Sequence, residues 1–202
     1  MQEHLGGGDK WDVVGPSFAQ SSGAPGVVDG TRGEFLRLVS YVGSRAVTNP
    51  SIYRNIGKLL DLTNFVDYCL LNAYAAMGDW PPNNWRAGKD QSTDGPWRFM
   101  VWDAEWGMGI YDRTVNINSF TERGGGPNDS GLGSVNNSEI ARIYDRLRAS
   151  PEFRLLWADR VQKHFFNGGA LTQENITVRF NELRDELRPL IPNMNTEILT
   201  WA

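Results

Sequence analysis

Residues 78–107 read GDWPPNNWRAGKDQSTDGPWRFMVWDAEWG, and the interpretation of the whole chain starts from this stretch. Two apolar-containing segments, 84–89 and 96–102, flank the turn-rich residues 90–95. Short runs of this kind around a cluster of Asp, Ser and Gly predict two antiparallel strands joined as a hairpin. Asp103 follows the second strand directly, so we expect a carboxylate at the end of a buried strand.

The segments on either side of the hairpin are predicted to be mostly helical. Upstream, apolar residues at helical spacing predict helices from Gly33, from Pro50 and over 61–78, the last ending at a left-handed Gly78. Downstream, the polar, Gly-rich residues 107–136 predict a long mobile loop, followed by further helices. We expect one α+β, mostly helical lobe over residues 1–202, with an irregular N-terminal segment over 1–30.

Composition excludes several classes of function. The chain has 202 residues and a formal net charge of -4, and no basic face is apparent, so we expect no nucleic-acid partner. No run of about 18 apolar residues occurs, so we expect no membrane span. One cysteine and two histidines exclude an intrachain disulfide and argue against a Cys- or His-based zinc site.

Tryptophan is unusually frequent, with eight residues in the chain. Five of them fall within one short stretch, namely Trp80, Trp85, Trp97, Trp102 and Trp106. Such a cluster is typical either of a core or of a concave binding wall, with the core the more common outcome.

The polar residues of 78–107 are suited to phosphoryl transfer. Asp79 and Asn84 have the D-x-x-x-x-N spacing of a protein-kinase catalytic loop. Asp103 and Glu105 stand where kinases place the carboxylate that binds magnesium, a cation that prefers oxygen ligands. A simpler interpretation makes Asp79 a turn residue and Asn83 and Asn84 ordinary loop residues. Asp103 is harder to explain in that way, because a carboxylate ending a buried strand needs a partner.

Residues 78–85 followed by 95–107 resemble the signature of the CotH (spore coat protein H) kinase family. The resemblance implies an atypical protein-kinase-like C-terminal lobe whose β-hairpin carries the metal-site Asp. It also implies that ATP, with Mg²⁺ or Mn²⁺, phosphorylates Ser or Thr of a protein substrate, in bacteria on a spore coat or cell surface. Asp79 would be the catalytic carboxylate, Asn84, Asp103 and Glu105 the metal ligands, and Asn83 and Trp102 nucleotide-binding residues.

The resemblance leaves the nucleotide-gripping part unaccounted for. Kinases need a phosphate-covering loop and a lysine ahead of the catalytic loop. Lys10 and Lys58 are the only lysines before Asp79, and no Gly-rich strand-turn-strand pattern surrounds either. We therefore expect either a C-terminal lobe fragment of a longer protein or a degenerate form, with weak or absent nucleotide turnover in both cases.

Two other functions are compatible with the same residues. A carbohydrate-active hydrolase would use the tryptophans for sugar stacking and a carboxylate pair drawn from Asp79, Asp103 and Glu105. A non-catalytic binding or structural module would have kept the lobe and lost the chemistry.

Overall fold

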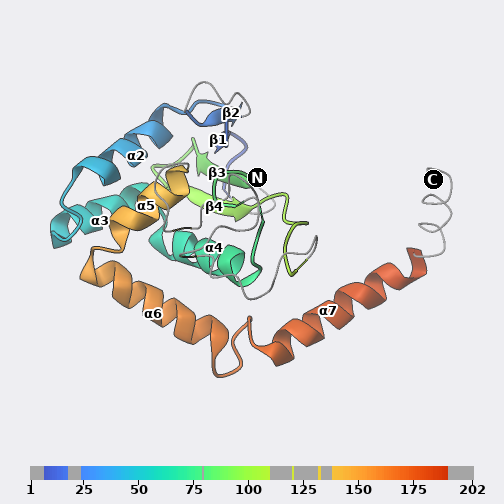
Figure 1. Cartoon of the computed structure of the whole chain (residues 1–202). Coiled ribbons are helices and arrows are strands. Elements are labelled where there is room, and N and C mark those ends of the chain that lie inside the picture. The colour runs from blue at the N-terminus through green and yellow to red at the C-terminus, as the bar shows by residue number, and fades with distance from the viewer. Residues whose placement is uncertain are drawn as a thin grey trace. The chain divides into compact units, whose positions relative to one another are not determined.

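The computed structural model describes residues 7–17, 24–78, 80–109, 120, 132 and 138–190, which form helices and one antiparallel sheet (Figure 1). The strands are β1 (Trp11–Gly15), β2 (Gly26–Asp29), β3 (Trp85–Asp90) and β4 (Arg98–Val101). The helices are α2 (Gly33–Ser44), α3 (Pro50–Leu59), α4 (Leu62–Tyr74), α5 (Glu139–Leu147), α6 (Pro151–Phe165) and α7 (Gln173–Leu187), followed by a 3-10 turn (Arg188–Leu190). The predicted α+β class is confirmed. Most of the predicted loop 107–136 lies outside the described residues.

The chain divides into two compact units. The first unit is Met1–Trp157 and the second is Ala158–Ala202. The first unit holds the sheet, α2 to α5 and the residues of the candidate site. In the second unit, the side chain of Asn175 donates to the carbonyls of Gly168 and Gly169, which fixes the turn before α7.

The sheet has the order β2-β1-β3-β4, with every neighbouring pair antiparallel. The predicted hairpin is present as β3 and β4, in which Trp85 lies opposite Val101. The prediction of an irregular segment over 1–30 was wrong for β1 and β2. These strands are only five and four residues long, and β1 forms because β3, far away in the sequence, gives it a hydrogen-bonding partner.

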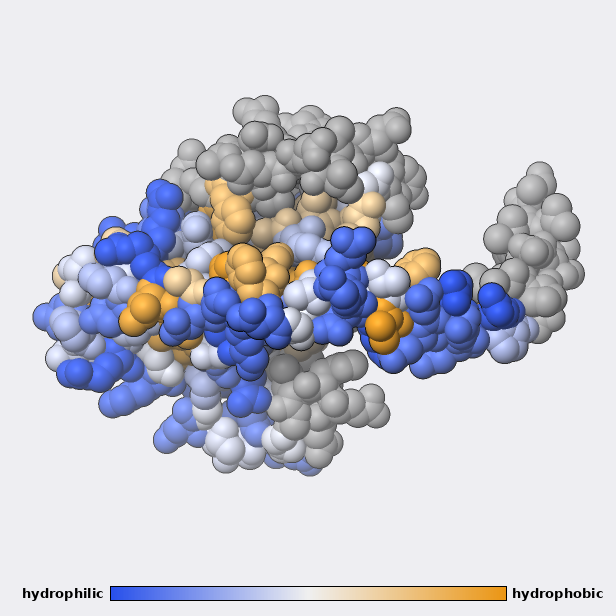
Figure 2. Space-filling view, turned by 90° about the horizontal axis from the view of Figure 1, so that it is seen from below, coloured by the Kyte–Doolittle hydropathy of each residue, from blue (hydrophilic) through white to orange (hydrophobic). Residues whose placement is uncertain are grey.

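Aromatic side chains fill the space between the sheet and the helices. Phe35 of α2 stacks on Trp85 at 5.7 Å between ring centroids and meets Trp97 edge-on at 5.2 Å. Phe99 of β4 packs at 5.3 Å against Phe65 of α4. All five side chains are buried, so most of the tryptophan-rich stretch belongs to the core. In contrast, hydrophilic residues predominate on the face shown in Figure 2.

The free edge of β4 is bound by the start of α4. The side-chain amide of Asn64 accepts a hydrogen bond from the backbone N–H of Phe99 at 2.6 Å and donates one to its carbonyl at 3.0 Å. Just before α4, the N–H of Asp61 donates to the carbonyl of Trp97 at 3.0 Å. Because an edge strand otherwise presents unpaired backbone groups, these contacts fix β4 in place.

Helix α4 is the most deeply buried helix near the sheet. It is capped by Asp61, whose carboxylate accepts a hydrogen bond from the N–H of Asn64 at 3.0 Å. Its cysteine, Cys69, is buried, and burial raises the pKa of the thiol well above its usual value.

The end of α4 differs from the prediction. Gly78 was expected to be the left-handed residue, but Ala76 has this conformation, with φ of 49°. The N–H of Ala76 donates to the carbonyl of Ala73, and the N–H of Met77 donates to that of Asn72. These two bonds are the Schellman pattern, which places the left-handed residue two positions before Gly78.

We predict that Asn64→Ala lowers the free energy of unfolding by about 1–3 kcal/mol, because both backbone groups of Phe99 lose their partner. Urea denaturation followed by circular dichroism measures the change. The control is Asn55→Ala at an exposed position of α3, which should change stability by less than about 0.5 kcal/mol. Equal effects of the two substitutions would contradict the proposed fixing of β4.

We predict that Ala76→Gly raises the free energy of unfolding by about 0.5–1 kcal/mol. Glycine removes the left-handed strain of Ala76, and the extra entropy of the unfolded chain offsets only part of this gain. Ala73→Gly, within the last turn of the same helix, is the control and should lower stability by about 1 kcal/mol. A loss of stability in both variants would show that Ala76 is not strained.

Candidate active site

Residues 106–108 lie against the end of α4. The N–H of Gly78 donates to the carbonyl of Trp106 at 3.0 Å, and the N–H of Met108 donates to that of Ala75 at 2.7 Å. The segment that follows β4 is thereby held beside the residues that follow α4. The two parts of the sequence motif, residues 78–85 and 95–107, therefore come close to each other at Gly78 and Trp106.

Gly107 allows this close approach. A Cβ atom at this position would lie 2.8 Å from the sulfur of Met77 and 3.2 Å from the carbonyl oxygen of Ala75. Both distances are shorter than an ordinary van der Waals contact. A residue larger than glycine would therefore push the 103–108 segment away from α4.

Trp80 anchors the loop between α4 and β3 to helix α4. Its indole N–H donates to the hydroxyl of Tyr68 on α4 at 2.7 Å, and the two rings pack at 6.0 Å between centroids. Both side chains are buried, and burial is the main reason why the pKa of Tyr68 is raised well above its usual value. Trp80 is thus held by packing and by a buried hydrogen bond.

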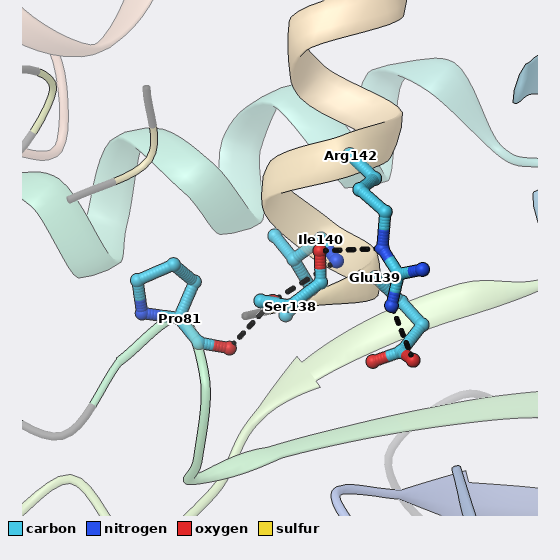
Figure 3. Close-up of polar contacts among 5 residues, drawn as sticks. All are labelled: Pro81, Ser138, Glu139, Ile140 and Arg142. Atoms are coloured by element: carbon cyan, nitrogen blue, oxygen red, sulfur yellow. Dashed lines mark hydrogen bonds and ion pairs between the residues drawn. The ribbon is translucent and has the colours of Figure 1, made fainter. Parts of the chain in front are cut away.

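The residue that caps α5 binds the same loop at Pro81 (Figure 3). The hydroxyl of Ser138 donates to the carbonyl of Pro81 at 2.8 Å and accepts from the N–H of Ile140 at 3.1 Å. One hydroxyl therefore caps α5 and binds the loop. In the first turn of α5, Arg142 and Glu139 form an ion pair at 3.1 Å.

Asn84 and Asp103 are brought together by a direct hydrogen bond. The side-chain amide nitrogen of Asn84 donates to the backbone carbonyl of Asp103 at 3.1 Å. Both residues have left-handed backbone conformations, with φ of 54° and 55°. Such conformations in residues other than glycine store strain and cluster at functional sites.

The remaining predicted site residues differ in their placement. Asn83, Trp102, Asp103 and Glu105 are exposed and Asn84 is half-buried. Trp102 is 49% exposed, in contrast to the buried Trp80, Trp85 and Trp97. Asp79 lies outside the described residues, between Gly78 and Trp80, whose contacts are given above.

The available donors are of the kind that a hard divalent cation binds. The hydrogen bond to Asp103 uses the nitrogen of Asn84, which leaves its side-chain oxygen as a donor atom. Within the described part of the chain, no group of three His, Cys, Asp or Glu residues could hold a metal ion.

A comparison with models of protein families assigns the chain to a family. A model described as CotH kinase protein matches residues 10–201 of the chain. The chain belongs to the CotH kinase family. No curated protein and no solved structure matches the chain.

This CotH kinase family chain also has features at the site that the sequence did not predict. Arg86 lies with its guanidinium over the ring of Trp102, and Ser138 holds Pro81. The bond from Ser138 to Pro81 joins positions that are far apart in the sequence. Within the described residues, no helix is long and apolar enough to cross a membrane.

We predict that Ser138→Ala lowers the free energy of unfolding by about 1–3 kcal/mol, because both the α5 cap and the bond to Pro81 are lost. Thermal and urea unfolding would measure the loss. Ser40→Ala, at an exposed position within α2, is the matched control and should not destabilise the chain. A destabilisation of Ser138→Ala no larger than that of Ser40→Ala would contradict the anchoring of the loop.

Proposed function

We propose that this chain contains the cation- and phosphate-holding part of an atypical protein kinase that phosphorylates Ser or Thr with ATP. Membership of the CotH kinase family supports a kinase-like function at the level of the family. The observation that carries the proposal within this chain is the hydrogen bond between the side chain of Asn84 and the backbone of Asp103. It places the side chain of Asn84 beside the backbone of Asp103, which supports a shared site for these two motif residues.

In this proposal the oxygen of Asn84 and the carboxylate of Asp103 hold Mg²⁺ or Mn²⁺. Glu105, two residues further and exposed, is the second carboxylate within reach of the same segment. The cation would supply charge neutralisation on the phosphates, which is the main requirement of phosphoryl transfer. The anchoring of the loop by Trp80 and Pro81 would keep Asn84 in position during this step.

Asp79 is proposed as the residue that accepts the proton of the substrate hydroxyl. The hydroxyl oxygen would then form its bond to the γ-phosphorus as the bond to the leaving ADP breaks. The residues on either side of Asp79 are held by the carbonyl of Trp106 and by the hydroxyl of Tyr68. A general base needs this kind of support from rigid elements.

Trp102 and Asn83 are proposed to contact the nucleotide. Trp102 is a large aromatic side chain that remains half exposed directly beside Asp103. Its ring offers a surface on which a nucleobase can stack. The association of the family with spore coats makes a bacterial coat or cell-surface protein the proposed substrate.

Cation binding provides a test that does not require turnover. We predict that MnCl₂ together with ATP, each at about 100 times its dissociation constant, raises the thermal unfolding midpoint of the chain by at least about 5 °C. Asp103→Ala should remove this shift, because it deletes the principal carboxylate ligand. Asp94→Ala, in the exposed turn of the hairpin, removes the same charge and should leave the shift unchanged.

A shift that persists in Asp103→Ala would place the cation elsewhere. Stabilisation by oligosaccharides in the presence of EDTA, without a response to manganese and ATP, would instead support a carbohydrate-active protein. No response to any of these ligands would support a non-catalytic module.

A further inference from the structure

The sheet has a second face, opposite the aromatic core, and Arg86 lies on it. Trp85 and Ala87 point into the core, and side chains alternate along a strand, so Arg86 points to the other side. On this side it meets Gly15 at the end of β1. A Cβ atom at Gly15 would lie 2.5 Å from Nη1 of Arg86, so a larger residue at position 15 would displace the guanidinium.

The guanidinium of Arg86 is held between several groups of the candidate site. It lies over the ring of Trp102 at 4.7 Å from the centroid, and its Nη1 donates to the carbonyl of Trp85 at 3.0 Å. Arg86 is only 9% exposed. Burial lowers the pKa of its guanidinium, and the carboxylate of Asp103 acts in the opposite direction. The guanidinium thus stacks on the residue that directly precedes Asp103, and its charge interacts with the carboxylate of Asp103.

We propose that Arg86 is a positioning residue of the site: its guanidinium fixes the ring of Trp102 for nucleotide stacking and balances the charge of Asp103 until the cation binds. This inference rests on the proposed function and adds a residue to it. Arginine suits both roles because its planar group stacks on an aromatic face, whereas the compact ammonium of lysine does not.

The two roles predict opposite effects on the two ligands. A positive charge near Asp103 repels a divalent cation, so removing it should strengthen the binding of the cation alone. The same removal takes away the guanidinium that stacks on Trp102 and an attraction for the phosphates, so it should weaken the binding of ATP. A residue with a purely structural role would instead weaken the binding of both ligands in parallel.

The test uses the full chain with the substitutions Arg86→Gln and Arg86→Lys. Binding of Mn²⁺ alone is measured by the electron paramagnetic resonance of the free ion, and binding of ATP at saturating Mg²⁺ by calorimetry. For Arg86→Gln we expect Mn²⁺ to bind at least about threefold more tightly, and ATP about three- to tenfold more weakly. Arg86→Lys keeps the charge but not the stacking plane, so only the affinity for ATP should fall, by about the same factor.

Two further variants test whether the charge of Arg86 and the ring of Trp102 cause these effects. Arg37→Gln removes the same charge from an exposed position of α2 and should change neither affinity. Trp102→Ala should weaken ATP binding while leaving the affinity for Mn²⁺ within about twofold. Thermal unfolding of each variant verifies that it is folded, and Arg86→Lys alone decides the outcome if Arg86→Gln does not fold.

The outcomes separate this inference from the proposed function. If the unsubstituted chain binds neither Mn²⁺ nor ATP, both the proposed function and the proposed role of Arg86 are wrong. If the unsubstituted chain binds both, a parallel loss of both affinities in Arg86→Gln overturns only the role of Arg86. Unchanged ATP binding in Arg86→Lys would also overturn it.

Discussion

Phe99 is the residue on which the rest of the first unit depends. Its ring packs against Phe35 of α2, Phe65 of α4 and Trp85 of β3, and its backbone is bound on the free edge by Asn64. Aromatic packing fixes the depth of β4 in the core, and the two hydrogen bonds fix its position along α4. Since Asp103 comes shortly after β4, the placement of the candidate ligand follows from the packing of Phe99.

The site itself combines rigid supports with a strained centre. Trp80, Pro81, Trp106 and Met108 are all held by hydrogen bonds to or from helices α4 and α5 or the residues at their ends. Between these supports, Asn84 and Asp103 keep left-handed conformations, which Asn and Asp adopt more readily than most residues but still at a cost in free energy. The surrounding contacts therefore have to supply the free energy that maintains this geometry. Such an arrangement suits a site whose oxygen atoms must be aligned before a ligand arrives.

Local features of the fold were predictable from the sequence, and features formed between distant residues were not. The caps at Asn49, Asp61 and Ser138 depend on a few neighbouring residues, and the structure has all three. Strand β1 was missed because its partner β3 comes much later in the chain. The left-handed residue at the end of α4 was assigned to Gly78 because glycine favours that conformation, but the hydrogen bonds of the last turn place it at Ala76. Asn84 and Asp103 were identified by spacing, whereas the role of Arg86 depends on Gly15 and Trp102.

The deep burial of Cys69 makes the chain suitable for site-specific labelling. The thiol lies inside α4, and burial disfavours the thiolate, which is the reactive form. Because the sequence contains no second cysteine, a cysteine introduced on the surface would be the one that reacts with a maleimide probe. A fluorophore or spin label could thus be attached near the strained loop while the native thiol stays in place.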